Sequence, residues 1–233
     1  MRVAFVDTSG WDYTAQTPYE KPMGGSQSAL CYLAVELTKL GHPACVFSGR
    51  KSLRMSDGVA FWPISEAEIF GALNSFDIVV VLNTAVGRVM RDKLGVTKPM
   101  VLWNHHAVFQ PTIRSLRDDA GEQKAWDAIA FVSAAQRAPY LEEFGLAPAK
   151  TIVMHNGVSP AFADAPYVEP ISPPVLFYTS TPFRGLDVLL MAFPDIRMAT
   201  GATLKVFSSM AVYRQPDDAF FALYEQARSM DGV

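Results

Sequence analysis

The sequence is poor in cysteine and has no long apolar run. Its 233 residues include two cysteines, Cys31 and Cys45, and neither has a neighbouring cysteine or a spacing typical of metal ligands. This pattern excludes a disulfide framework and predicts buried, reduced thiols. No segment approaches the roughly 18 consecutive apolar residues of a membrane span, and the first apolar run is too short for the core of a signal peptide. We therefore expect a soluble, cytoplasmic protein.

Charge of either sign is also sparse. The chain has 20 basic and 23 acidic residues, a formal net charge of −3 and no long run of one sign. A surface dedicated to nucleic acid needs clustered positive charge, so we expect no nucleic-acid partner. Hydrophobic residues make up 50% of the chain, which is ample for a packed core and argues against disorder.

Short apolar runs alternate with amphipathic stretches over the first two thirds of the chain. The run at 77–82 is rich in β-branched residues and lacks alternation, as expected for a central parallel strand covered on both faces. Parallel neighbours need helical crossovers, so the pattern predicts an α/β fold with a doubly wound, Rossmann-like parallel sheet. The predicted strands are 3–6, 44–48, 59–62, 77–82, 100–103, 128–133 and 151–154, and the predicted helices are 25–40, 66–73, 115–124 and 134–144.

A proline-rich stretch divides the chain. Residues 160–174 contain five prolines, which deny amide donors to a strand and forbid a continuous helix, so we interpret them as a linker. Strand and helix patterns then resume at 175–178, 186–196, 203–207 and 217–230. The predicted organisation is an N-terminal Rossmann-like domain at 1–159, the linker, and a partial second α/β domain at 175–233.

Two adjacent glycines, Gly24 and Gly25, join an early loop to the first predicted helix, and Ser26 follows as a candidate helix cap. Glycines let a ligand approach the backbone, and the free amides of a first helical turn attract an anion such as phosphate. A simple turn is the alternative interpretation. The loop at 8–23 either covers a ligand cleft or packs its aromatic residues against its own underside.

Two histidines follow the predicted strand at 100–103. His105 and His106 would lie at the carboxyl edge of a parallel sheet, which is where such sheets bind ligands. Most isolated histidines are merely hydrogen-bonded side chains, but two adjacent ones at this edge indicate a possible contact with a ligand.

Several motifs together resemble the retaining GT-B glycosyltransferases of family 4, in particular bacterial members that act on cell-surface polysaccharides or protein glycans. The most specific motif is the run from Tyr178 to Leu190, which contains Thr181-Pro182-Phe183-Arg184-Gly185. The others are Gly24-Gly25-Ser26, Trp103-Asn104-His105-His106, Ser133 and His155-Asn156-Gly157-Val158.

This resemblance implies transfer of a sugar from a nucleotide sugar to an acceptor hydroxyl, with retention, in a cleft between two Rossmann-like domains. It implies no metal and no other cofactor, because fixed cations and helix-terminal amides stabilise the departing diphosphate. His106 would hydrogen-bond the transferred sugar and Arg184 would bind the diphosphate, so these are the expected catalytic residues. The expected donor-binding and phosphate-binding residues are Gly24, Gly25, Ser26, Ser180 and Arg184.

Further cleft residues are expected at His105, Ser133 and Asn156, although for Ser133 and Asn156 a role in a turn is the favoured interpretation. The expected partners are a nucleotide sugar and a sugar, lipid-linked or protein acceptor. Peripheral contact with the inner membrane is left open, since members of the family often lie on its inner leaflet.

The chain departs from the family at its end. The second domain of the family continues through more strands and includes a late loop with two glutamates, whereas this sequence stops at Val233. The chain would then be a truncated piece, or its partial domain would pack on the first domain, or two copies would complete each other. Because a two-stranded sheet is marginal alone, we favour a homodimer as a hypothesis.

Two other functions stay open from the sequence. A catalytically silent relative could retain the sugar or phosphate pocket and act as a scaffold or regulatory partner. An epimerase acting on nucleotide sugars shares the two-domain architecture and would consume the donor without an acceptor.

Overall fold

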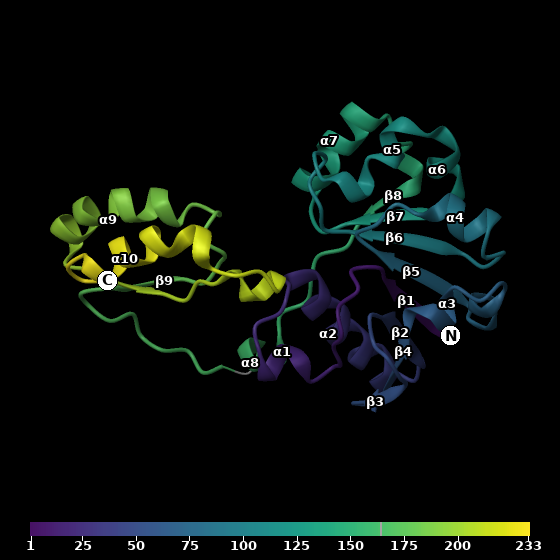
Figure 1. Cartoon of the computed structure of the whole chain (residues 1–233), viewed down its shortest axis with the longest axis horizontal. Helices are drawn as coiled ribbons and strands as arrows, with labels where there is room; N and C mark the ends of the chain where they lie inside the picture. Colours follow the sequence, from purple (N-terminus) through teal and green to yellow (C-terminus); the bar gives the residue numbers. More distant parts are fainter. Residues whose placement is uncertain (164) are drawn as a thin grey trace. The chain divides into compact units, whose positions relative to one another are not determined.

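A computed structural model describes residues 1–163 and 165–233 of the chain, which form two compact units (Figure 1). Unit 1 comprises Met1–Lys21 and Gly25–Ser159, and unit 2 comprises Pro22–Gly24 and Pro160–Val233. The predicted linker at 160–174 includes Asp164, which lies outside the described residues, and a one-turn helix, α8, at Pro160–Ala163. The proline pattern did not predict this turn.

Unit 1 is built on an eight-stranded sheet in the order β3-β4-β2-β1-β5-β6-β7-β8. Every neighbouring pair is parallel except β3 and β4. This arrangement confirms the predicted Rossmann-like α/β class. The strands are β1 (Val3–Asp7), β2 (Ala44–Ser48), β3 (Arg54–Ser56), β4 (Val59–Pro63), β5 (Ile78–Leu82), β6 (Met100–Asn104), β7 (Ala128–Phe131) and β8 (Thr151–Val153).

Helices pack against this sheet through a continuous apolar core. Ala4 and Val6 of β1 lie in one buried cluster with residues of β5, β6, β7 and helix α7. Side chains alternate along a strand, so Phe5 faces the other side. The helices are α1 (Thr17–Glu20), α2 (Gly25–Lys39), α3 (Ile64–Ala67), α4 (Gly87–Asp92), α5 (Ser115–Asp118), α6 (Ala120–Ala125) and α7 (Ala134–Phe144).

Two predicted helices are wrong as continuous elements. The helix predicted at 66–73 is interrupted, because α3 ends at Ala67 and a separate 3-10 turn begins after Gly71, whose φ is +77°. The helix predicted at 115–124 splits at Asp119, whose extended backbone ends α5. The Asp119 side chain then caps α6 by accepting a hydrogen bond from the amide of Gly121, at 2.7 Å.

The sequence analysis missed β3 and α4. Strand β3 pairs antiparallel with β4 through a turn at Asp57 and Gly58, whose φ values are +50° and +78°. An Asp-Gly pair is a strong hairpin signal. Helix α4 has no local cap; instead the buried carboxylate of Glu122 accepts from the amides of Gly87 and Arg88, at 2.6 and 2.9 Å.

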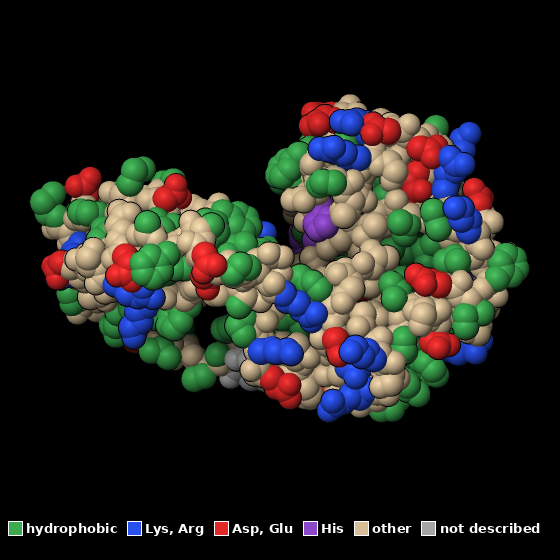
Figure 2. All heavy atoms as spheres, in the orientation of Figure 1, with side chains coloured by type: hydrophobic (Ala, Val, Ile, Leu, Met, Phe, Trp, Pro, Cys, Tyr) green, Lys and Arg blue, Asp and Glu red, His purple; other side chains and the backbone are tan. Residues whose placement is uncertain are grey.

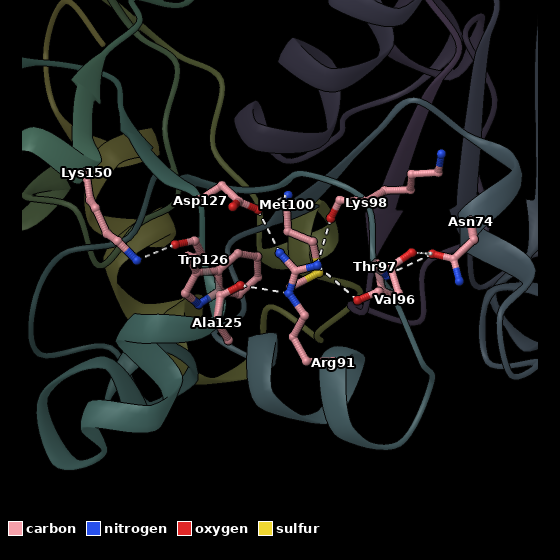
Figure 3. A network of polar contacts seen from close by, with 10 residues as sticks. All are labelled: Asn74, Arg91, Val96, Thr97, Lys98, Met100, Ala125, Trp126, Asp127 and Lys150. Carbon is pink, nitrogen blue, oxygen red and sulfur yellow. Dashed lines mark hydrogen bonds and ion pairs between the residues drawn. The ribbon is translucent and has the colours of Figure 1, made fainter.

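A separate network of polar contacts lies at the edge of the sheet where its parallel strands begin (Figure 3). The guanidinium of Arg91 donates to the carbonyls of residues 96, 98 and 125 and pairs with Asp127 at 2.7 Å. Lys150 donates to the Trp126 carbonyl at 2.9 Å, and Asn74 accepts from the amide of Thr97 at 2.8 Å. These contacts connect α4 to the starts of β6 and β7, so this edge is a structural one.

Unit 2 is smaller, and its helices cover one face of its sheet. Its parallel strands β9 (Val175–Tyr178) and β10 (Thr203–Val206) pack with helices α9 (Leu186–Thr200) and α10 (Phe221–Ser229) around a core that includes Leu190 and Phe193. On the sheet, Phe177 and Phe207 stack with ring centroids 6.3 Å apart, and each is 61% exposed. Figure 2 shows further hydrophobic side chains at the surface of this unit.

In the described part of the chain, no helix has the length and apolar character needed to cross a membrane. Neither cysteine forms a disulfide: Cys31 is buried and Cys45 is half-buried. Burial raises the pKa of both thiols. They therefore stay protonated and unreactive near neutral pH.

Candidate functional site

The carboxyl end of β1 carries a buried carboxylate. Asp7 is 2% exposed and accepts hydrogen bonds from the Tyr13 hydroxyl at 2.8 Å and the Gln27 side-chain amide at 3.2 Å. The Tyr13 ring meets Phe61 edge to face, with centroids 6.1 Å apart. Burial, followed by the charge of Asp7, raises the pKa of Tyr13. This part of the loop at 8–23 therefore packs its own underside.

The glycine pair lies where the sequence predicted, at the start of α2. Gly24 is buried and Gly25 is exposed, and a Cβ at Gly25 would meet no atom within 4 Å. The open space beside Gly25 leaves room for a ligand. Packing alone does not require a glycine at this position, because a Cβ would meet no neighbour. Ser26 is the second residue of α2 rather than its cap, so the predicted capping role is wrong: a capping residue must precede the first helical residue.

The two histidines follow β6 in a turn held by buried amide side chains. Asn104 is fully buried, and its Oδ1 accepts from the backbone amide of His106 at 3.0 Å. Asn83, at the end of the neighbouring strand β5, accepts from the backbone amide of His105 at 2.7 Å. Both asparagines thus fix the backbone from which the histidine side chains project.

Helix α7 supports the same turn from the other direction. The Gln136 side chain donates to the carbonyls of Asn104 and His106, both at 3.0 Å, and the Tyr140 hydroxyl donates to the His106 carbonyl at 2.7 Å. Ser133 caps α7 by accepting from the Gln136 amide at 3.0 Å. The sequence motif included Asn104 but gave it no role of its own. Gln136 and Tyr140 were missed, because nothing in their local pattern distinguishes them from ordinary helix residues.

Each histidine side chain has a different partner. His105 Nε2 lies 3.1 Å from Oδ1 of Asn156, and His106 Nδ1 lies 2.8 Å from the hydroxyl of Thr112. Burial lowers the pKa of both rings, so both are neutral at neutral pH. Figure 2 shows histidine side chains reaching the surface of unit 1 among mostly uncharged atoms. This cluster suits an uncharged polar ligand.

The predicted donor-binding residues of unit 2 lie in the loop from β9 to α9. Arg184 is exposed and donates from Nη2 to the Tyr213 hydroxyl at 3.0 Å, while its guanidinium lies 5.9 Å from the centroid of the Phe183 ring. Helix α9 begins after Gly185, which has φ +94°, and no side chain caps it. Ser180 is half-buried earlier in the same loop.

One hydroxyl in this loop has no partner. Thr181 is 4% exposed, and its Oγ1 forms no hydrogen bond with any described residue. The Thr181 carbonyl, in contrast, accepts from the Tyr178 hydroxyl at 2.7 Å. The features of this loop that suit an anion are the exposed Arg184 and the start of α9, which no side chain caps. Asp187, in the first turn of α9, carries a negative charge that disfavours an anion at this position.

The predicted site residues thus form two groups. Gly25, Ser26, His105, His106, Ser133 and Asn156 belong to unit 1, and Gly24, Ser180 and Arg184 belong to unit 2. Within unit 1, the structure brings His105 to Asn156 but directs His106 to Thr112. No group of three or more metal-ligating side chains lies close enough to hold a metal ion within the described ranges 1–163 and 165–233.

Comparison with known proteins yields structural likeness alone. No protein-family model and no curated protein matches the sequence. A glycosyltransferase from Rickettsia africae aligns over 100% of this chain with a TM-score of 0.63 and 14% identity. HepE from Anabaena in complex with UDP, and the same protein with UDP and glucose, align over 98% with TM-scores of 0.59 and 0.57 and 17% identity. The chain spans 66% of the length of each of these proteins. It therefore shares a fold with glycosyltransferases.

Proposed function

We propose that the chain is a glycosyltransferase that transfers a sugar, with retention, from a nucleotide sugar to an acceptor hydroxyl in the synthesis of a cell-surface polysaccharide or glycan. Two structures of one structural neighbour, HepE, support the choice of donor, since both contain UDP and one also contains glucose. The residue pattern of the loop from β9 to α9 supports the choice of chemistry. The acceptor is a sugar, a lipid-linked sugar or a protein.

The observation that carries this proposal is the anion-binding arrangement at the start of α9. Arg184 presents several donors in a planar fork that matches two phosphate oxygens. The uncapped start of α9, one residue after Gly185, adds backbone amides with positive potential. Together they stabilise the negative charge that develops on a departing diphosphate, so no metal is required in this proposal.

Calorimetry with UDP and GDP tests this proposal directly. We expect micromolar binding of one nucleotide, weakened about tenfold or more in Arg184→Ala because a charge-assisted pair is lost. Arg228→Ala is the matched control, since Arg228 is an exposed arginine of the same unit that pairs with Glu225 within α10. The absence of binding to any nucleotide would contradict the proposal.

Turnover separates an enzyme from a silent relative. If the nucleotide binds, UDP-glucose or its GDP counterpart is incubated with the chain and release of the diphosphate is measured with and without simple sugar acceptors. Acceptor-dependent release supports transfer. Binding without release would favour a scaffold, and conversion of the donor sugar without an acceptor would favour an epimerase.

We also propose that the chain forms a homodimer through unit 2. The sheet of this unit has an apolar surface at Phe177 and Phe207, and both rings are 61% exposed. Burying such rings in an interface is favourable. Light scattering checks this proposal: a strictly monomeric mass at high protein concentration would contradict it.

A further inference from the structure

One asparagine of the chain precedes a glycine in an exposed segment. Asn156 and Gly157 are both exposed, and residues 154–159 form neither helix nor strand. The amide of Gly157 forms no hydrogen bond with any described residue, and a Cβ at this glycine would meet no atom within 4 Å. The backbone nitrogen of Gly157 is therefore free to approach the Asn156 side chain, and glycine gives the backbone the freedom that this approach needs.

The other three asparagines of the sequence are held in place. Asn83 and Asn104 are buried, and each accepts a hydrogen bond from a backbone amide of the turn after β6. Asn74 lies half-buried in a 3-10 turn, where its side chain accepts from the Thr97 amide and donates to the Gly95 carbonyl, both at 2.8 Å. Asn156 thus differs from the other three in both exposure and backbone freedom.

The Asn156 side chain also contacts the first histidine after β6. His105 Nε2 lies 3.1 Å from Oδ1 of Asn156, and because an amide oxygen accepts, the imidazole is the donor. If a nucleophile attacks the side-chain carbonyl carbon, negative charge develops on this same oxygen, where the imidazole donor stabilises it. The contact favours attack at Asn156 and places His105 beside the product.

The reaction that these groups allow is deamidation. The Gly157 nitrogen bonds to Cγ of Asn156 and loses its proton, and the side-chain amide leaves as ammonia, which gives a five-membered succinimide. Water then adds to one of the two ring carbonyls and breaks its bond to the ring nitrogen. Opening at Cγ gives aspartate, and opening at the backbone carbonyl gives isoaspartate. One water is consumed and one ammonia is released, with no oxidation or reduction.

We propose that Asn156 and Gly157 form a self-modifying site: Asn156 deamidates, and the new carboxylate holds His105 in its protonated form. Before the reaction, burial lowers the pKa of His105, and the charge of His106, the titratable group that acts on it, works in the same direction. A carboxylate at hydrogen-bond distance favours the imidazolium and raises this pKa. A neutral pair of side chains thereby becomes an ion pair as the protein ages. The chemistry needs no nucleotide or sugar, so it does not rest on the proposed function.

Mass spectrometry of the whole chain, aged in mildly alkaline buffer and then digested, tests the modification. We expect the peptide that contains Asn156 to gain about 1 Da, because an amide NH2 is replaced by OH, and the peptide that contains Asn74 to keep its mass. Gly157→Ala is the matched variant. The φ of Gly157 is not positive and the added methyl meets no atom, so the fold is kept, and we expect deamidation to slow about tenfold or more. An unchanged mass at Asn156, or equal rates in the two chains, would overturn the site.

Nuclear magnetic resonance titration of the histidine rings tests the consequence. The chain has four histidines, and the His105 signal is the one lost in His105→Gln. We expect a higher pKa of His105 in Asn156→Asp and in the aged wild type than in the fresh wild type. Asn156→Gln keeps a neutral amide and is the control. The same His105 titration in Asn156→Asp and Asn156→Gln would overturn the link to His105. Failure of nucleotide binding in calorimetry would leave both measurements unaffected, so this proposal and the proposed function fail independently.

Discussion

The histidine turn of unit 1 and the arginine loop of unit 2 are built in opposite ways. The turn after β6 is fixed by buried side chains such as Asn104, and its two imidazoles are neutral because burial lowers their pKa. The loop before α9 is exposed at Arg184, which keeps its charge in solvent. A rigid neutral site selects an uncharged ligand by geometry, whereas an exposed cation attracts an anion over a distance.

The largest expected effect concerns the rigidity of the histidine turn. Asn104→Ala should lower the free energy of unfolding by about 2 to 3 kcal/mol, because it removes the partner of the His106 amide inside a buried site. Urea denaturation followed by tryptophan fluorescence measures this, since all four tryptophans lie in unit 1. Asn156→Ala is the control, and as an exposed side chain it should change stability by less than about 0.5 kcal/mol. Equal effects of the two variants would contradict the comparison.

The next prediction concerns the exposed cation. Nucleotide binding should weaken as salt concentration rises, and Arg184→Ala should remove most of this dependence because the screened charge is gone. Wild-type affinity at low salt should exceed that of the variant about tenfold. Calorimetry over a salt series measures this effect; a variant with the same salt dependence as the wild type would be inconsistent with Arg184 as the source of the attraction.

A third prediction uses pH. All four histidines lie in unit 1. Burial lowers the pKa of His105 and His106 below the ordinary value of 6.5, so the unfolded chain takes up protons first as pH falls. Their contribution to stability is therefore present above pH 6.5 and is lost progressively below it.

Urea denaturation at neutral and mildly acidic pH measures this loss through tryptophan fluorescence. The double variant His105→Gln, His106→Gln should flatten the dependence of unit 1 stability on pH. Because unit 2 has no histidine, hydrogen-exchange protection in α9 should not change over the same interval. A variant as acid-sensitive as the wild type would assign the effect to other groups.

Much of the fold could be predicted from the sequence because its determinants are local. The run at 77–82 predicted the central strand β5, which begins one residue later, and the Gly24-Gly25 pair marked the start of α2 to within one residue. Helix α4 could not be found in this way. Its first amides are satisfied by Glu122, about 35 positions further along the chain, and no local pattern reports such a contact.

The candidate site divides along the same line. The sequence located His105 and Asn156 at strand ends, and the structure brings these two side chains together. The pattern of residues could not show that Trp103 and His105 each keep an unpaired polar atom, because pairing depends on side-chain packing in three dimensions. The roles of Gly25 and Arg184 in binding one diphosphate stay predictions.

The smallest expected effects compare two serines that the sequence placed near helix starts. Ser133 accepts from the Gln136 amide as the cap of α7, so Ser133→Ala should lower the free energy of unfolding by about 1 kcal/mol. Ser26 lies inside α2, where alanine is the better helix former, so Ser26→Ala should be neutral or stabilising by about 0.3 kcal/mol. Both serines lie in unit 1, so the same tryptophan-monitored denaturation measures both. A loss of equal size at Ser26 would restore its capping role, whereas loss of nucleotide binding without loss of stability would assign Ser26 to the ligand.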